Sequence, residues 1–307
     1  MYVCRHVRVD NCLIHNGGDD ALVLKSDYST GMPKPSYDHI YSNLIIASKG
    51  ASALRFGSET VGEIYDILWE NITIKEAAKA AIGLVSMDGS HIHNITYRNI
   101  SAMAAGIPFW LYIGARNRRP RGPDNAQHLG SITHITVENF TGTHLRDPDQ
   151  KQHPFWEWPA ALDGQDVNAT FNVTRPVPIG PGIRFRDIHL RFPGGGTPNL
   201  THIDPPHWAN EYEPWRYCPR EYCPGGLSLP SFAWFIRHVT DITIDGMEIE
   251  YESKEARPPI IIEDAKNVSI LHATTQRDQG VGYDVGLRRT PLSEVRAPGL
   301  TVKVLSR

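Results

Sequence analysis

A short β-rich run that carries an asparagine near its end recurs along the first half of the chain. Its copies occupy residues 9–12, 40–45, 67–72, 95–100 and 135–140, with the asparagines at Asn11, Asn43, Asn71, Asn99 and Asn139. Successive asparagines are 32, 28, 28 and 40 residues apart. Periods of about 20–50 residues are typical of stacked units, each of which buries its apolar face only against a neighbour. The sequence therefore predicts a solenoid.

Second strands, at residues 21–24, 53–56 and 81–85, lie between these runs and precede Gly, Ser or Asp turn residues. A helical pattern is confined to a brief stretch at residues 74–81. A sandwich would instead show antiparallel hairpins with Asn-Gly or Asp-Gly turns. We therefore expect an all-β chain folded as a single-stranded right-handed parallel β-helix. Its asparagines would stack at equivalent bends and bond the backbone of the next coil, because Asn tolerates left-handed turn geometry.

The repeat lapses over a long irregular stretch, at about residues 145–231, and resumes at residues 235–244 and 260–268. We therefore expect one domain over residues 1–307, with the irregular stretch as a loop insertion. Loops inserted into a solenoid usually lie on one face and shape a binding site. Within the insertion, Cys218 and Cys223 flank a short loop that a disulfide could close.

The composition excludes some partners. The formal charge is −3, from 31 basic and 34 acidic residues, and no Lys/Arg block suits a phosphate backbone, so nucleic acid is not expected. No apolar run approaches the roughly 20 residues that span a bilayer, and residues 1–10 contain no signal-peptide segment, so no membrane partner is expected.

Asn-x-Ser/Thr sequons occur eight times, which favours an extracellular or periplasmic protein. They begin at Asn71, Asn94, Asn99, Asn139, Asn168, Asn172, Asn199 and Asn267. The alternative is that a strand repeat ending in a turn produces the same tripeptide without any glycan.

Two adjacent carboxylates, Asp19 and Asp20, follow a glycine pair at the turn into residues 21–24. Neighbouring strand residues face opposite ways, but Gly17 and Gly18 permit a backbone geometry that brings both carboxylates to one surface. Glycoside hydrolysis needs such groups, because a protonated carboxyl donates to the leaving oxygen while an ionised one activates water or attacks carbon. In general, crowding of like charges raises the pKa of one member of a pair. The alternative for an isolated pair is a solvated turn or a weak calcium site.

The residues around the pair resemble the signature of glycoside hydrolase family 28, the polygalacturonases and rhamnogalacturonan hydrolases. The resemblance is carried by residues 11–14, 18–20 and 22–26, and one repeat later by residues 53–59, which look like that family's strand ending in Ile-Gly-Ser-Glu. It covers residues 9 to about 142 well. It implies a pectin-lyase-like solenoid and an inverting hydrolase. In that family the position of Asp19 is the general acid, and that of Asp20 positions and deprotonates the attacking water.

The chain departs from the family pattern at three places. A further catalytic Asp, expected in an Asn-Thr-Asp motif one coil before the pair, is absent, and Asp10 lies on the strand leading directly to Asp19. Either the natural protein starts upstream of Met1 or water activation is incomplete. The family's Gly-His-Gly corresponds to residues 51–53, which contain no histidine, and its Arg-x-Lys corresponds to residues 83–85, which carry no cation.

A galacturonate in the reactive subsite would therefore lack a charge-assisted partner. We expect a pectic or related plant polysaccharide as the substrate, other than plain polygalacturonan. Candidates for binding it are Lys49, Ser52, Arg55, Glu59 and Asp88, followed by His91, Arg116 and Arg118. Arg55 and Glu59 are favoured because they share the repeat after Asp19, although a solvated turn charge explains each candidate equally well.

Four tryptophans of the insertion either stack on sugar rings or form a small core of the loop itself. They are Trp156, Trp158, Trp208 and Trp215. The histidines lack a tight metal-ligand spacing, so we expect no metal and no cofactor. Two other function classes remain open. One is a β-helix that only binds carbohydrate, and the other is a polysaccharide lyase, which needs a basic residue near the uronate carbon and commonly calcium.

Overall fold

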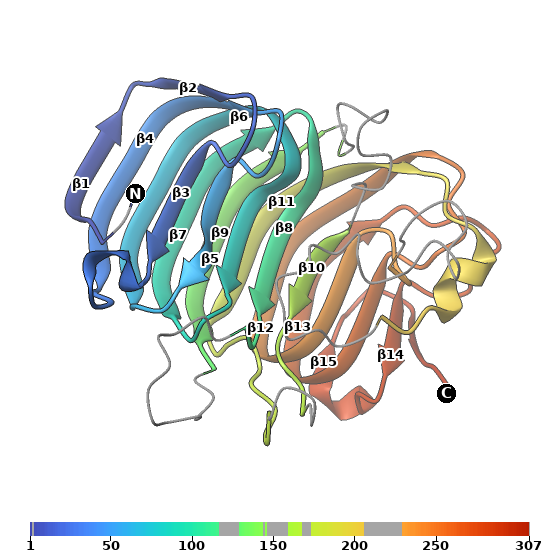
Figure 1. Cartoon of the computed structure of the whole chain (residues 1–307). Coiled ribbons are helices and arrows are strands. Elements are labelled where there is room, and N and C mark those ends of the chain that lie inside the picture. Colours follow the sequence, from blue (N-terminus) through green and yellow to red (C-terminus); the bar gives the residue numbers. More distant parts are fainter. Residues whose placement is uncertain are drawn as a thin grey trace.

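The computed structural model describes residues 1, 3–116, 129–143, 145, 159–167, 173–205 and 229–306. The fold is all-β, with 62% of the described residues in strands. Figure 1 shows curved strands lying side by side along the length of the molecule, with the two termini at opposite ends of the stack. Among the described residues, no helix has the length and apolar character needed to cross a membrane.

The strands are β1 Arg5–Asp10, β2 Leu13–Asn16, β3 Leu22–Ser26, β4 Ser36–Ser48, β5 Leu54–Thr60, β6 Ile64–Ser86, β7 His91–Ala102, β8 Ala105–Ile113, β9 Ser131–Gly142, β10 Ala160–Asp163, β11 Ile183–Gly194, β12 Trp234–Ser253, β13 Ile260–Thr275, β14 Val285–Arg288, β15 Val295–Arg296 and β16 Val302–Val304. Short 3-10 turns are η1 Tyr28–Thr30, η3 Pro198–His202 and η5 Leu292–Glu294.

All pairings between these strands are parallel, and they join residues one repeat apart. A continuous row runs β1-β4-β6-β7-β9-β11-β12-β13-β14-β16. Within it, Trp69 of β6 lies opposite Tyr41 of β4 and Tyr97 of β7. A second row joins β3, β5, β6, β8, β10 and β12. Equivalent residues of successive sequence repeats therefore lie opposite one another on neighbouring strands.

The pairing also closes on itself, so the prediction of an open single-stranded right-handed parallel β-helix is wrong. From β6 the partners run through β7, β9, β11, β12, β10 and β8 and return to β6, which makes a closed core of seven parallel strands. The remaining strands, from β1 to β5 and from β13 to β16, continue the pairing on either side of this ring.

Two long strands cause the closure. Separate strands were expected around residues 67–72 and 81–85, with a helical possibility between them, but β6 is one strand of 23 residues. Its first half pairs with β7 and its second half with β8. The 20-residue strand β12 does the same, since its first part pairs with β10 and its later part with β11.

A ladder of asparagines marks one bend of the stack, formed by Asn43, Asn71, Asn99 and Asn139. All four have positive φ, between 53° and 56°, so the expected left-handed conformation is confirmed. Each side-chain amide donates to the side-chain oxygen of the preceding member, at 2.9 to 3.3 Å, and Asn43 donates to Asp10 Oδ1 at 2.8 Å. The partner is therefore a neighbouring side chain and not the expected backbone of the next coil.

This asparagine ladder also accounts for part of the sequon pattern. The sequons at Asn71, Asn99 and Asn139 place their amide nitrogens in ladder hydrogen bonds. Asn94 likewise donates to Asp66 Oδ1 at 3.2 Å, and Asn267 donates to Asp241 Oδ1 at 2.9 Å. These five tripeptides lie within the strand repeat, which is the position that the alternative interpretation predicts for them. The sequons at positions 168 and 172 lie outside the described residues.

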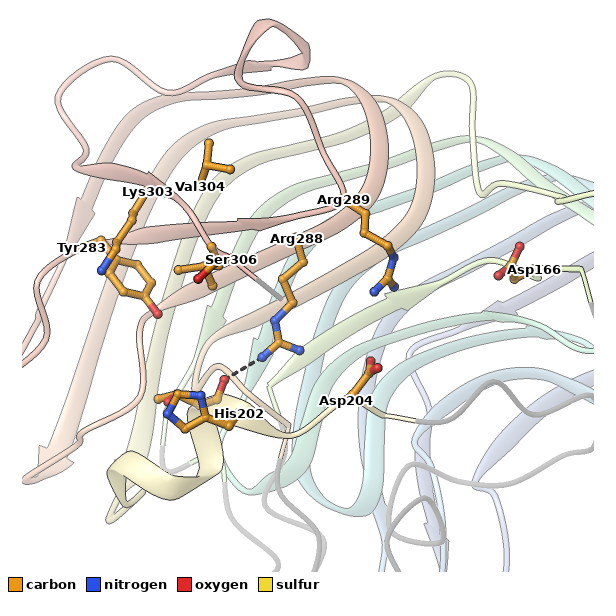
Figure 2. Close-up of a pocket in the computed structure, with 11 residues that line it drawn as sticks. Asp166, His202, Asp204, Tyr283, Arg288, Arg289, Lys303, Val304 and Ser306 are labelled. Carbon is orange, nitrogen blue, oxygen red and sulfur yellow. Dashed lines mark hydrogen bonds between the residues drawn. The ribbon is translucent and has the colours of Figure 1, made fainter.

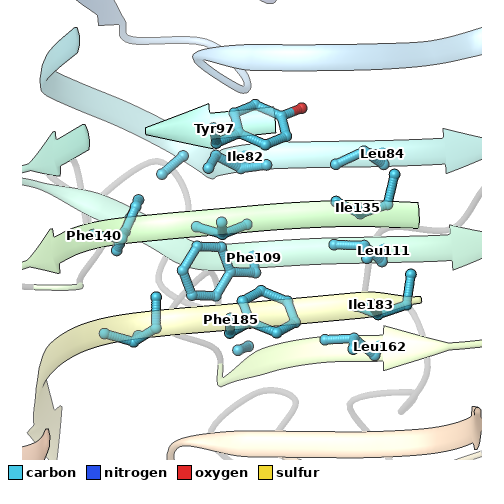
Figure 3. Packing of buried hydrophobic residues seen from close by; sticks show 14 of the residues in the cluster. Ile82, Leu84, Tyr97, Phe109, Leu111, Ile135, Phe140, Leu162, Ile183 and Phe185 are labelled. Atoms are coloured by element: carbon cyan, nitrogen blue, oxygen red, sulfur yellow. The ribbon is translucent and has the colours of Figure 1, made fainter. Parts of the chain in front are cut away.

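Large apolar side chains stack in the interior of the fold. Trp69 lies between Tyr41 and Tyr97, with ring centroids at 4.0 and 6.0 Å. Farther along, Phe109 of β8 packs against Phe140 of β9 and Phe185 of β11 with centroids 4.5 and 5.2 Å apart (Figure 3). Because Phe109 reaches the core from one side and the other two rings from the opposite side, this cluster holds the two halves of the ring together.

We predict that Asn71→Ala destabilises the fold more than Asn71→Gly. Both changes remove two exposed ladder hydrogen bonds, each worth about 0.5–1.5 kcal/mol at most. Alanine additionally forces a Cβ into the left-handed conformation, which costs about 1–2 kcal/mol and which glycine avoids. Denaturant unfolding of the two variants measures the difference. Equal losses would show that the left-handed backbone contributes nothing here.

A buried histidine makes the stability of the fold depend on pH. His39 of β4 is 1% exposed, and its ring contacts Tyr41 Oη at 2.7 Å and the carbonyl oxygen of Cys4 at 3.0 Å. Burial lowers the pKa of His39 below the usual 6.5, partly opposed by the bond to Cys4. Above pH 6.5 the ring is neutral in both the folded and the unfolded chain. Below it the unfolded chain takes up the proton first, so stability falls.

We therefore expect the free energy of unfolding to decrease as the pH falls below 6.5, and His39→Gln to make that decrease shallower. His238, whose pKa burial also lowers, supplies a further part of the slope. His15→Gln is the control, because that side chain is exposed. Unfolding midpoints at several pH values give the slopes, and an unchanged slope in His39→Gln would contradict this account.

Candidate functional site

The Asp19–Asp20 turn joins β2 to β3 at the amino-terminal end of the sheet. The turn one repeat later packs directly beneath it: Ser48 Oγ donates to the carbonyl oxygen of Asp19 at 2.7 Å. A Cβ on Gly50 would lie 2.5 Å from the backbone of Gly18, so only glycine fits at position 50. Gly17 and Gly18 do not have positive φ, so the special backbone geometry expected just before Asp19 is not present. The position that requires glycine is Gly50, because of its close approach to Gly18.

The two carboxylates have different surroundings. Asp20 is turned toward the next repeat, where its Oδ1 accepts the Ser52 N–H at 2.9 Å and its Oδ2 lies 3.4 Å from Arg55 Nε. Its side chain is only 10% exposed. Asp19 is exposed, and its Oδ1 accepts the N–H of Asp20 at 2.8 Å. One carboxylate is therefore fixed in orientation, whereas its neighbour faces solvent.

Arg55 of β5 provides this fixation. It is 2% exposed, and its guanidinium lies 5.1 Å from the ring centroid of Trp110 on β8. Its Nη1 donates to Ser52 Oγ at 3.4 Å and its Nη2 donates to Ser58 Oγ at 3.0 Å. A guanidinium stacked on an indole and held at several nitrogens has little rotational freedom, so it places Asp20 reproducibly.

A second ionic cluster adjoins the first through Ser58. Arg116 Nη2 donates to the Ser58 carbonyl oxygen at 2.9 Å. Its Nε and Nη2 also donate to the carboxylate of buried Asp88, at 3.0 and 2.5 Å. Glu59 bonds Lys25 Nζ at 2.6 Å and lies 3.9 Å from Arg116. Burial raises the pKa of Glu59, but the hydrogen bonds from Lys25 and from the backbone, together with the charges of Lys25 and Arg116, outweigh it, so the net pKa is lowered.

The structure therefore brings most of the expected site residues into one polar network. It contains Asp20, Lys25, Ser52, Arg55, Ser58, Glu59, Asp88 and Arg116. Lys49 is exposed beside the Asp19 turn. His91 of β7 lies outside the network and contacts Ser131 Oγ of β9 at 2.8 Å. Arg118, the four candidate tryptophans, Cys218 and Cys223 lie outside the described residues.

Sequence reasoning assigned no role to Lys25 or Ser58. For Lys25 a signal was present in the sequence. It is 34 residues before Glu59, which is about one repeat, so the spacing itself places the two residues on neighbouring strands. Within the described ranges, no group of three or more His, Cys, Asp or Glu side chains is arranged to hold a metal ion.

A cavity of about 930 Å³ lies at the other end of the sheet, among β14, β16 and the segment after η3 (Figure 2). Asp19 and Asp20 do not line it. Comparisons with protein-family models, with curated proteins and with solved structures found no match.

We predict that Arg55→Gln lowers the free energy of unfolding by roughly 3 kcal/mol, because it leaves the enclosed Asp20 carboxylate without its cation. Lys25→Gln is the matched comparison, since it breaks a pair whose side chains are 24% and 29% exposed and should cost about 1 kcal/mol or less. Denaturant titrations of both variants provide the measurement. Equal costs would mean that Arg55 is no more important to the fold than a surface cation.

Proposed function

We propose that this chain is a glycoside hydrolase that cleaves a pectic or related plant polysaccharide by inverting acid–base hydrolysis. Asp19 is the general acid, and Asp20 holds and deprotonates the attacking water. The observation that carries the proposal is the unequal surroundings of the two neighbouring carboxylates. The resemblance of residues 11–26 and 53–59 to glycoside hydrolase family 28 supports the same assignment.

The unequal surroundings suit this division of labour. A general acid must reach the glycosidic oxygen of a bound chain, and Asp19 is the exposed member of the pair. A group that orients water must itself be held still, and Asp20 is held by Ser52 N–H and Arg55. The two roles therefore fall on the residues to which the resemblance also gives them.

The cations near the pair bear on the choice of substrate. Arg55, Lys25 and Arg116 each face a carboxylate of the chain itself. Opposite Arg55 on the next strand is Gly83, which has no side chain to offer. A uronate at the reactive position would therefore compete with internal carboxylates for these cations. This favours a neutral sugar or a rhamnogalacturonan-type chain at that position, with exposed Lys49 available to donate to a substrate oxygen.

A panel of pectic fractions and neutral plant glycans first identifies the polysaccharide from which the protein releases reducing sugar. On that polysaccharide, Asp19→Asn and Asp20→Asn should each lower the rate of release by about 100-fold or more. Loss of a general acid or base typically costs about 10²–10⁴-fold in rate. Glu250→Gln is the control, because this carboxylate is exposed on β12, far from the pair along the sheet.

The configuration of the product provides an independent check. Inverting hydrolysis requires that the first-formed reducing ends have the opposite anomeric configuration to the bond cleaved, which proton NMR detects before mutarotation. Full activity in Asp19→Asn would remove the assignment. Glycan binding with no sugar release would identify a binding protein, and unsaturated products that disappear on chelation would identify a lyase.

A further inference from the structure

The side chain of Arg55 lies across a neighbouring strand. Arg55 of β5 is opposite Gly83 of β6, which in turn is opposite Trp110 of β8, so a whole strand separates Arg55 from the tryptophan. Neighbouring strands lie about 4.7–4.9 Å apart, so only a long side chain that crosses β6 can make this contact. The guanidinium carbon of Arg55 is 5.1 Å from the Trp110 ring centroid. The arginine therefore extends sideways over β6.

Gly83 leaves the space that this crossing needs. A Cβ at position 83 would lie 3.7 Å from Ala80 Cβ and 3.9 Å from Arg55 Cγ, which is ordinary van der Waals contact. The further atoms of a larger side chain would enter the volume over β6 in which Arg55 lies. Gly83 does not have positive φ, so its backbone conformation does not require glycine. The size of the residue at position 83 therefore decides whether Arg55 can lie against Trp110.

Trp110 offers the guanidinium a fixed aromatic face. It is 1% exposed and belongs to a buried apolar cluster that includes Val85 and Phe235. Its ring also stacks on that of Tyr112, with the centroids 6.2 Å apart. An indole attracts a cation over its face more strongly than the other aromatic side chains do, and the attraction grows when water is excluded. Trp110 therefore holds the guanidinium of Arg55 in one place.

The contact between Arg55 and Asp20 depends on this hold. Arg55 Nε lies 3.4 Å from Asp20 Oδ2, while its η nitrogens donate to Ser52 Oγ and Ser58 Oγ. A hydroxyl group rotates to suit its partner, so the two serines do not define the plane of the guanidinium. The flat face of Trp110 does define that plane, and with it the direction in which Nε points.

We propose that Trp110 and Gly83 are positioning residues for hydrolysis, which act through Arg55 on Asp20. Both residues are buried, so neither contacts the substrate. The inference rests on the proposed function, in which Asp20 holds and deprotonates the attacking water. A misplacement of about 1 Å can cost about 100-fold in rate. Loosening Arg55 therefore lowers kcat, whereas KM changes little because substrate binding does not depend on the orientation of the water.

Steady-state kinetics of Trp110 variants test this inference on the polysaccharide that the wild-type protein cleaves. Trp110→Leu removes the ring and should lower kcat about tenfold or more, with KM changed less than about twofold. Trp110→Phe keeps an aromatic face and should retain most of the wild-type kcat. Trp234→Leu is the control, because it removes an indole that is 0% exposed and packs against Phe185 instead of Arg55. Its kcat per folded molecule should equal that of the wild type.

Variants of Gly83 disturb the same contact without removing an aromatic ring. The loss of kcat should increase with side-chain size, from Gly83→Ala to Gly83→Val, and this pair decides the question if Trp110→Leu does not fold. In an Asp20→Asn background, Trp110→Leu should cause no further loss, because the group that Trp110 positions is already disabled.

The possible results separate this inference from the proposed function. Absence of sugar release by the wild-type protein would overturn the proposed function and this inference with it. Wild-type release with unchanged kcat in Trp110→Leu and Gly83→Val would overturn the inference alone. Equal losses in Trp110→Leu and Trp110→Phe, an equal loss in Trp234→Leu, or a further loss in the Asp20→Asn background would also overturn it, since each indicates a general effect on the fold.

Discussion

Parallel pairing of residues one repeat apart is the constraint on which the rest of this structure depends. When each strand lies in the same register on its neighbour, every side chain meets the side chain at the equivalent position of the next repeat. Like residues that attract one another can then stack, as Asn71 does on Asn43 and Trp69 does on Tyr41. The backbone hydrogen bonds set the spacing, and the side chains select which register is stable.

The same register also places charged residues of alternating sign opposite one another on neighbouring strands. Asp163, Arg237, Glu263 and Arg288 follow one another across β10, β12, β13 and β14. Arg237 is 0% exposed and bonds Asp163 through two nitrogens, at 2.9 and 2.6 Å. An enclosed cation of this kind is tolerable only because the neighbouring strands supply carboxylates on both sides. Arg288, the last member of this row, lines the cavity of about 930 Å³.

How far the sequence predicted the structure depends on the range of each interaction. The left-handed asparagines and the strands at residues 40–45 and 95–100 follow from local pattern, and so does the placing of Asp20, Ser52 and Arg55 together. The closure of the ring does not. It requires β6 to continue through residues 76–81, where four alanines favour a helix by intrinsic propensity. Ala77, Ala78, Ala80 and Ala81 are all 0% exposed, and small side chains let the strand bend while neighbouring strands pack against it.

The individual side-chain contacts of the polar network could not be predicted, because the spacing of residues in the sequence does not give the distances between side chains. That Lys25 bonds Glu59, or that Ser58 links Arg55 to Arg116, follows from how the outward residues of β3 and β5 lie after the sheet has formed. The register between these strands shifts between Leu24 and Ser26, so the position on β5 that lies nearest to Lys25 does not follow from the repeat spacing.

A strand at the edge of a parallel stack presents backbone groups that can recruit a strand from another molecule. Within the described structure, β16 pairs only with β14, is three residues long and has exposed Lys303 at its centre. A short strand with a central charge is a poor template for strand addition, so β16 opposes growth of the sheet from one molecule to the next.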